Sequence, residues 1–278
     1  FIQAAKQLEG STVELMKMGE PGVPEMNAYI EEVLQAGETL GFDGRVVSVG
    51  EGQGYADIAA KKGAHVNYQE DLIDEIWSDR PAMSEEPAFD LDVKYAGETV
   101  ADKLARIRKE MKDAGANTHV MTTLDDICWT LNIRGNDIDF FPMVLSYAIV
   151  TMNGVELYID ERKLDDALKA KLAADGVKLH PYNDIYEDVK KFAEDTVVMV
   201  DPGKLNYAIF NNIPENVKTI EQRNPAILMK AKKNPIEIEN IRKAQIKDSV
   251  AHVRFMKWLK ENVGKMKITE MSASDKLD

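Results

Sequence analysis

Hydrophobic and polar residues follow two different periods along this chain, and each period predicts its own kind of element. Ahead of Gly115, apolar residues recur every three or four positions, as in an amphipathic helix: Val100, Leu104, Ile107 and Met111. Elsewhere, short runs rich in β-branched residues alternate with helical segments. This alternation predicts an α/β fold with mixed strands.

The predicted strands cover residues 12–18, 39–43, 64–68, 117–122, 143–152, 155–159, 177–180, 196–200 and 217–220. Helices are predicted over residues 1–8, 23–34, 48–63, 70–77, 98–114, 125–131, 162–174, 184–193, 204–210 and 236–263, with a further helical pattern from residue 268. Ser48 and Glu51 have the spacing of a capping box, and Asn153-Gly154 between two β-rich runs is a strong hairpin signal.

The two halves of the chain resemble one another in the order of their elements. Strand, helix, strand, helix and strand follow each other from residue 13 to 68 and again from residue 155 to 220. The offset drifts between 142 and 158 residues, so the similarity is one of element order rather than of sequence. We expect two copies of one fold.

Two changes of character divide the chain. Pro81 and Pro87 stand in an acidic stretch without apolar period, which is typical of a linker. After Arg223 the chain changes to a long helical pattern with a continuous apolar stripe. The expected division is therefore a first domain over residues 1–80, a linker over 81–97, a second domain over 98–222 and the start of a third over 223–278.

The composition and charge of the chain disfavour several classes of function. The 278 residues carry 48 acidic and 35 basic side chains, a net charge of -13 that disfavours broad contact with nucleic acid or an anionic membrane. Cys128 is the single cysteine, so an internal disulfide is excluded and a reducing cytoplasm is favoured. No apolar run approaches the length of a spanning helix. Because the chain begins with Phe1 and its last helical pattern breaks off, we expect a piece of a longer protein.

Three sequence features suggest chemistry and are weak when taken alone. The glycines of residues 50–54 mimic a dinucleotide fingerprint, but Tyr55 replaces the third glycine, so a helix start on the surface is favoured. The four histidines are 54 or more residues apart and lack the spacing of paired metal ligands. Acidic pairs at Asp125-Asp126 and at Asp137 with Asp139 favour solvated or capping roles, and Cys128 a core thiol.

A polar loop, Asn132 to Asp137, stands between a tryptophan-containing helix and the predicted hairpin. Such loops often carry function, and Arg134 offers a forked, permanent cation for a carbonyl or carboxylate group. The alternative is that Arg134 pairs with Asp137 or Asp126 and simply fixes the loop. The residues alone leave both interpretations open.

The segment from Leu124 to Asp137, followed by Pro142 and by Ser146 to Ile149, resembles the middle-domain signature of the three-domain Xaa-Pro aminopeptidases (aminopeptidase P). Further matches occur in the family's order along essentially the whole chain: residues 1–8, 15–19, 76–81, 180–182, 246–248 and 269–273. The resemblance implies the end of one creatinase-like N-terminal domain, all of a second, and the first helices of a pita-bread catalytic domain.

The resemblance also implies a function. Enzymes of this family remove the N-terminal residue from peptides with proline in second position, using two divalent metal ions, commonly manganese, held by two Asp, one His and two Glu. These ligands would lie beyond Asp278, so the chain as given is expected to be inactive. By analogy, Asn132, Arg134 and Asp137 shape the peptide entrance. A cytoplasmic location is expected, with a homodimer for the full-length enzyme and a monomer for this piece.

One alternative of another class stays open. A similar scaffold occurs in histone-chaperone subunits that resemble these peptidases but lack their metals, and an acidic chain suits basic partners. On this interpretation the chain is a metal-free binding module. The signature loop and the continuous resemblance favour the peptidase.

Overall fold

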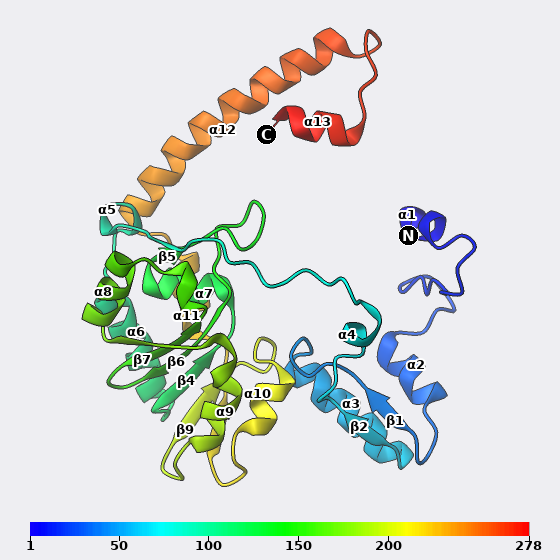
Figure 1. Ribbon diagram of the computed structural model, residues 1–278, viewed down its shortest axis with the longest axis vertical. Coiled ribbons are helices and arrows are strands. Elements are labelled where there is room, and N and C mark those ends of the chain that lie inside the picture. Colours follow the sequence, from blue (N-terminus) through cyan, green and yellow to red (C-terminus); the bar gives the residue numbers. More distant parts are fainter. Residues whose placement is uncertain (278) are drawn as a thin grey trace.

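The computed structural model describes residues 1–277, and its elements alternate as the hydrophobic pattern predicts (Figure 1). The α-helices are α1 (Ile2–Gln7), α2 (Met26–Val33), α3 (Val49–Lys62), α4 (Leu72–Ile76), α5 (Val93–Ala96), α6 (Val100–Asp113), α7 (Leu124–Leu131), α8 (Asp166–Ala174), α9 (Ile185–Asp188), α10 (Tyr207–Asn212), α11 (Pro225–Ala231), α12 (Pro235–Asn262) and α13 (Glu270–Leu277). The strands are β1 (Thr39–Gly41), β2 (His65–Asn67), β3 (Phe89–Asp90), β4 (Thr118–Met121), β5 (Ile133–Arg134), β6 (Ser146–Thr151), β7 (Val155–Ile159), β8 (Val177–His180), β9 (Val197–Val200) and β10 (Lys218–Glu221).

A six-stranded sheet with the order β10-β9-β4-β6-β7-β8 forms the centre of residues 88–231, called the central unit below. Strand β6 pairs antiparallel with both of its neighbours, β4 and β7. The other three pairs, β10 with β9, β9 with β4, and β7 with β8, are parallel. The sheet is therefore mixed, as predicted. The expected hairpin around Asn153-Gly154 is confirmed as the antiparallel pair β6 and β7.

Both faces of this sheet are covered by helices, because successive side chains along a strand point to opposite faces. On β6, Ala148 and Val150 join the core under α6, α7 and α8, while Ile149 joins the core under α9 and α10. On β7, Leu157 and Tyr158 divide in the same way. The result is a three-layer α/β arrangement with strands that are apolar on both sides.

Residues 1–77, called the first unit, contain a smaller sheet. Strands β1 and β2 pair in parallel and are connected by α3, around a small core of Leu34, Ile58 and Ala59. Ser48 and Glu51 form the predicted capping box at the start of α3, and Gly63 ends the helix with a left-handed backbone (φ +67°). The sequence therefore determines both ends of this helix correctly.

Several predictions about local structure need correction. Residues 12–18 were expected to form a strand, but no strand of the described residues pairs with them, and Val13 is 60% exposed. Alternation alone does not supply a partner for the backbone groups. The helix predicted from Lys204 begins at Tyr207, because Asn206 caps it through its side chain. The helix predicted over 162–174 is split into a 3-10 turn (Glu161–Lys163) and α8.

The glycine-rich helix start lies on the surface only in part, since Gly50 and Glu51 are exposed whereas Gly52 is buried. A Cβ on Gly52 would lie 2.3 Å from Cδ2 of Tyr207, so α3 and α10 approach closely at this point. The helix starts also exchange main-chain hydrogen bonds: Val49 N donates to Leu205 O and Tyr207 N to Val47 O, each over 2.9 Å. The first and central units therefore meet where α3 and α10 begin.

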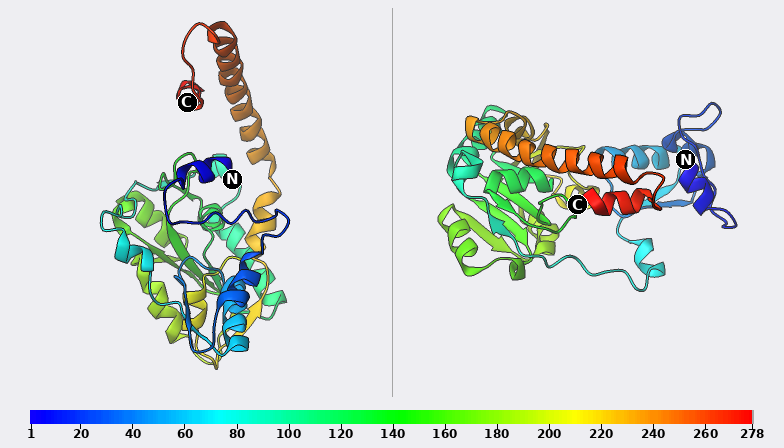
Figure 2. Two further views of the ribbon diagram at one scale, coloured as in Figure 1. Left: turned by 90° about the vertical axis from the view of Figure 1, so that its right-hand side faces the viewer. Right: turned by 90° about the horizontal axis from the view of Figure 1, so that it is seen from above.

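The long helix α12 extends away from the central unit, and α13 folds back beside its far end (Figures 1 and 2). The apolar stripe of α12 is exposed over much of the length of the helix, for example at Ile246 (67%) and Val253 (66%). Among residues 1–277, no helix combines the length and hydropathy required to cross a membrane.

Candidate functional site

A groove of about 450 Å³ lies on the central unit beside the start of α12. Its walls come from α5, α7, β5, α11, α12 and the loop of residues 135–145 between β5 and β6, called the 135–145 loop below. Among the side chains that line it are Trp129, Arg134, Phe141, Met143, Lys230 and Glu237. The groove combines apolar walls with several charged groups, as ligand sites usually do.

Arg134 is the residue of the predicted loop that lines the groove. Its Nη1 donates to the carbonyl oxygens of Cys128 (2.7 Å) and Ile133 (2.8 Å), so one edge of the guanidinium is fixed by the backbone. Within residues 1–277, Nε and Nη2 donate to no protein acceptor. Burial lowers the pKa of Arg134 from its ordinary value, but a guanidinium stays charged in proteins. The expected alternative, pairing with Asp137 or Asp126, is not what the structure shows.

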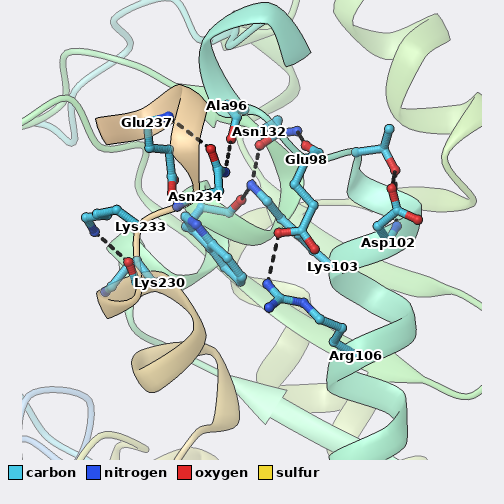
Figure 3. Close-up of polar contacts among 12 residues, drawn as sticks. Ala96, Glu98, Asp102, Lys103, Arg106, Asn132, Lys230, Lys233, Asn234 and Glu237 are labelled. Carbon is cyan, nitrogen blue, oxygen red and sulfur yellow. Dashed lines mark hydrogen bonds and ion pairs between the residues drawn. The ribbon is translucent and has the colours of Figure 1, made fainter. Parts of the chain in front are cut away.

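Asn132 lies beneath the groove and is fully buried. It ends α7 with a left-handed backbone (φ +51°), a conformation that asparagine tolerates better than most residues. Its Oδ1 accepts from Lys103 Nζ over 2.6 Å, and its Nδ2 donates to Glu98 O over 2.9 Å (Figure 3). Asn132 thus fixes the backbone from which Arg134 extends.

Lys103 supports this arrangement from α6 and is only 1% exposed. Its ammonium also donates to Trp129 O over 2.7 Å and lies 4.4 Å from the centre of the Trp129 ring. Burial lowers its pKa to about 8, while the nearby carboxylates of Glu98 and Glu237 act in the opposite direction. A buried lysine held mainly by carbonyl oxygens is uncommon, because burying a charge is costly unless it is well paired.

The side chain of Asp137 is also buried, at the base of the 135–145 loop. Its Oδ2 accepts from Lys163 Nζ over 2.6 Å and from Leu145 N over 2.7 Å. Both side chains of the ion pair are at most 1% exposed. The pair therefore ties the loop to the segment that follows β7.

The acidic pair of α7 is held by α11 and the segment before it. Lys230 Nζ binds Asp126 over 2.7 Å and also contacts Asp125. Asp126 additionally accepts from Asn224 Nδ2 over 2.9 Å and is 1% exposed. Of the two roles expected for Asp126, solvated or capping, the solvated one is wrong, because a lysine and an amide 98 or more residues away along the chain cover it.

The groove is closed on one side by the joint between α5 and α12. Asn234 caps α12 in a capping box with Glu237, and its Nδ2 donates to Ala96 O over 2.8 Å (Figure 3). Gly97 has φ +70°, and a Cβ there would lie 2.3 Å from Asn234 Oδ1. The direction in which α12 leaves the central unit is therefore set by a few close contacts.

The sequence pattern indicates the loop but not its supporting lysines, Lys103 and Lys163. A signal for Lys103 exists, because it lies on the apolar face of α6 between Val100 and Leu104. A polar residue at such a position has to find a buried partner. We see no comparable signal for Lys163, which precedes α8 in a short 3-10 turn.

The residues described do not form a metal centre. Nowhere in residues 1–277 do three or more His, Cys, Asp or Glu side chains gather closely enough to hold a metal ion. Cys128 is buried, and burial raises the pKa of its thiol to about 11, which suits a core residue.

Comparison with known proteins agrees with this architecture. The family model "Creatinase/Prolidase N-terminal domain" matches residues 79–237. A probable Xaa-Pro aminopeptidase P from Sordaria macrospora is 34% identical over the whole chain, which covers 47% of that relative, and aminopeptidase P2 from Arabidopsis thaliana is 32% identical, with 44% covered. The chain thus spans about half the length of these relatives.

The structural comparison gives a similar result. The chain superposes over its full length on 46% of a crystal structure of X-prolyl aminopeptidase from Caenorhabditis elegans, with a TM-score of 0.93 and 31% identity. That protein is described as a cytosolic enzyme with a di-nuclear active site. The chain therefore belongs to the Xaa-Pro aminopeptidase P family and carries its creatinase/prolidase N-terminal domain.

Proposed function

We propose that this chain is the N-terminal and middle portion of an Xaa-Pro aminopeptidase and that it controls access of peptides to the catalytic centre. The full-length protein would hydrolyse the bond between the first residue of a peptide and a proline in second position. The observation that carries the proposal is the superposition of the entire chain on an X-prolyl aminopeptidase with a TM-score of 0.93.

The catalytic centre of the full-length protein would hold two divalent metal ions, and we propose manganese. Bound metal ions would activate a water molecule and polarise the peptide carbonyl. Residues 1–277 offer no cluster that fits such a pair of ions, so their ligands would come from outside this range. The part of the protein described here would therefore contribute binding and selection rather than bond cleavage.

We assign the peptide entrance to the groove of Arg134, with Asn132 and Asp137 as positioning residues. Arg134 has N–H groups directed away from its backbone partners, which suits a peptide carbonyl or carboxylate. Asn132 acts through the buried Lys103, and Asp137 acts through the buried Lys163. The two pairs fix the two ends of the segment that carries Arg134. A rigid mouth favours substrates that fit it and excludes others.

The chain would be divided as its sequence suggests. Residues 1–80 form the end of a first creatinase-like domain, residues 98–222 form a second one, and residues 223–278 begin a pita-bread domain. The full-length protein would be a cytoplasmic homodimer that acts on peptides and on neither nucleic acid nor membranes, whereas this portion alone would be monomeric and inactive.

Hydrolysis of peptides with a penultimate proline, with manganese added, tests the function in the complete gene product. Substitution of Arg134 by Ala should raise KM for such peptides about tenfold, the value of one charge-assisted hydrogen bond, and leave the bound metal unchanged. Arg134→Lys keeps the positive charge but lacks the forked guanidinium, so its KM should lie between those of the wild type and Arg134→Ala. Lys109→Ala, which removes the exposed ion pair of Lys109 with Asp113, serves as the control. Unaltered kinetics in Arg134→Ala would refute the assigned entrance.

A metal-free binding module remains the second candidate, supported by the net charge of -13. Metal analysis of the complete gene product distinguishes the two. A protein without bound divalent metal that retains a basic protein partner would favour the module over the peptidase.

A further inference from the structure

The tip of the 135–145 loop presents apolar side chains to solvent. Phe140 is 91% exposed, and its neighbours Phe141 and Ile138 are 48% and 39% exposed. A group of exposed apolar side chains on one short loop is a common mark of a binding site. The polar residues that fix the base of the loop do not explain why its tip exposes apolar side chains.

The backbone at the tip is strained. Phe140 has φ +62°, and within residues 1–277 the only other residue apart from glycines with a positive φ is Asn132. Asparagine tolerates the left-handed region, whereas a bulky aromatic residue there is an outlier that its surroundings must enforce. Nothing in the packing of the loop requires a phenylalanine at this position, since its side chain is almost fully exposed.

The base of the loop holds the tip in place. Phe141 N donates to Ile138 O over 3.1 Å, and Asp137 N donates to Met143 O over 3.2 Å, so the chain reverses within a tight turn. The buried Asp137 and Lys163 pair anchors the first arm, and Asp137 also accepts from Leu145 N on the second arm. Phe140 is thus presented on a fixed support rather than on a free segment.

The tip stands next to the groove assigned to the peptide. Phe141 and Met143 line that groove together with Arg134. The loop rises from the central unit at the end from which α12 extends (Figures 1 and 2). A peptide seated beside Arg134 would pass the tip of the loop.

We propose that Phe140 is a specificity-determining residue that packs against an apolar side chain of the substrate on the C-terminal side of its proline. This inference rests on the proposed function. An aminopeptidase of the proposed kind would hold the first residue and the proline at its catalytic centre, so the part of the peptide that lies at the entrance follows the proline. An aromatic ring fixed in the open is suited to an apolar side chain, because burial of both surfaces from water is favourable.

The test uses Phe140→Gly in the complete gene product with manganese. Glycine adopts a positive φ without strain, so the variant removes the ring and leaves the fold at least as stable. We expect KM to rise on the order of tenfold for a pentapeptide with Leu after the proline. For an Xaa-Pro dipeptide, which lacks the contacted residue, KM should stay within about twofold of the wild-type value.

Controls separate the possible outcomes. Phe140→Asn also tolerates the left-handed backbone and should match the glycine variant, and Ile76→Ala removes another exposed apolar side chain (80%) as a neutral reference. Equal effects on the dipeptide and the pentapeptide would overturn the proposal. A fall in melting temperature in Phe140→Gly would also overturn it, because it would show that the ring packs against the protein itself. Absence of hydrolysis in the wild type would instead refute the proposed function.

Discussion

Single buried charges decide how the candidate entrance is held together. Asp137 and Lys163 are shielded from water on every side, so removal of either partner leaves the other charged and unpaired. Asp137→Ala should lower the free energy of unfolding by about 3–5 kcal/mol, measured by urea denaturation. Asp113→Ala breaks the exposed pair with Lys109 and should cost at most about 0.5 kcal/mol. If both variants lost the same amount, the loop base would not depend on this pair.

The stability contribution of Lys103 depends on pH. Burial lowers its pKa in the folded protein from the ordinary value of 10.5 to about 8, so the unfolded chain binds more protons between these values. The free energy of unfolding should therefore rise from pH 8 to pH 10.5, by at most about 3 kcal/mol from this residue. Urea denaturation across this range should show a smaller rise in Lys103→Met than in the wild type. Lys112→Met, which replaces an exposed lysine of the same helix, should keep the wild-type slope; a Lys103→Met slope equal to the wild type would contradict the expectation.

At the level of elements, Gly97 controls how α12 is attached. Gly97 and Gly115 both have positive φ, but only at Gly97 would a Cβ meet neighbouring atoms, those of Asn234. Alanine at either position costs about 1 kcal/mol from its backbone alone. Gly97→Ala should in addition break the Asn234 cap and speed hydrogen exchange in the first turn of α12. Equal exchange in Gly97→Ala and Gly115→Ala would show that this joint is not held by Asn234.

Elements with a strong local signal were predictable from the sequence. The apolar stripe located α6, Asn153-Gly154 located the hairpin, and Ser48 with Glu51 located the start of α3. The strand expected over residues 12–18 failed because an alternating pattern does not reveal whether a neighbouring strand exists. Local signals therefore gave most elements, while pairing had to come from the structure.

The candidate site was predictable only in part. The polar loop was identified, and Arg134 lies in a groove, but the partners of Asn132 and Asp137 are 29 and 26 residues away along the chain. Contacts over such separations leave no trace in residue spacing. The exposed Phe140 was missed for a related reason, since the positive φ that marks it is visible only in coordinates.

At the level of the whole molecule, Gly52 and Tyr207 set the contact between the first and central units. Gly52→Ala would place a Cβ within 2.8 Å of three atoms of the Tyr207 ring, so it should separate the units and lower the melting temperature by several degrees. Gly54→Ala, two residues along the same helix, meets only Asn27 at 3.8 Å. It should be neutral or stabilising, because alanine favours helix. Thermal unfolding of both variants provides the measurement, and equal shifts would contradict the contact.

The exchange of hydrogen bonds between the starts of α3 and α10 has a consequence for the stretch that joins the two units. Residues 81–88 contain no helix or strand and are mostly exposed, so a protease would be able to cut the chain there. The two pieces would nevertheless stay associated through the main-chain hydrogen bonds of Val49 with Leu205 and of Tyr207 with Val47. A nicked molecule would therefore behave as one particle in native chromatography and as two only after denaturation.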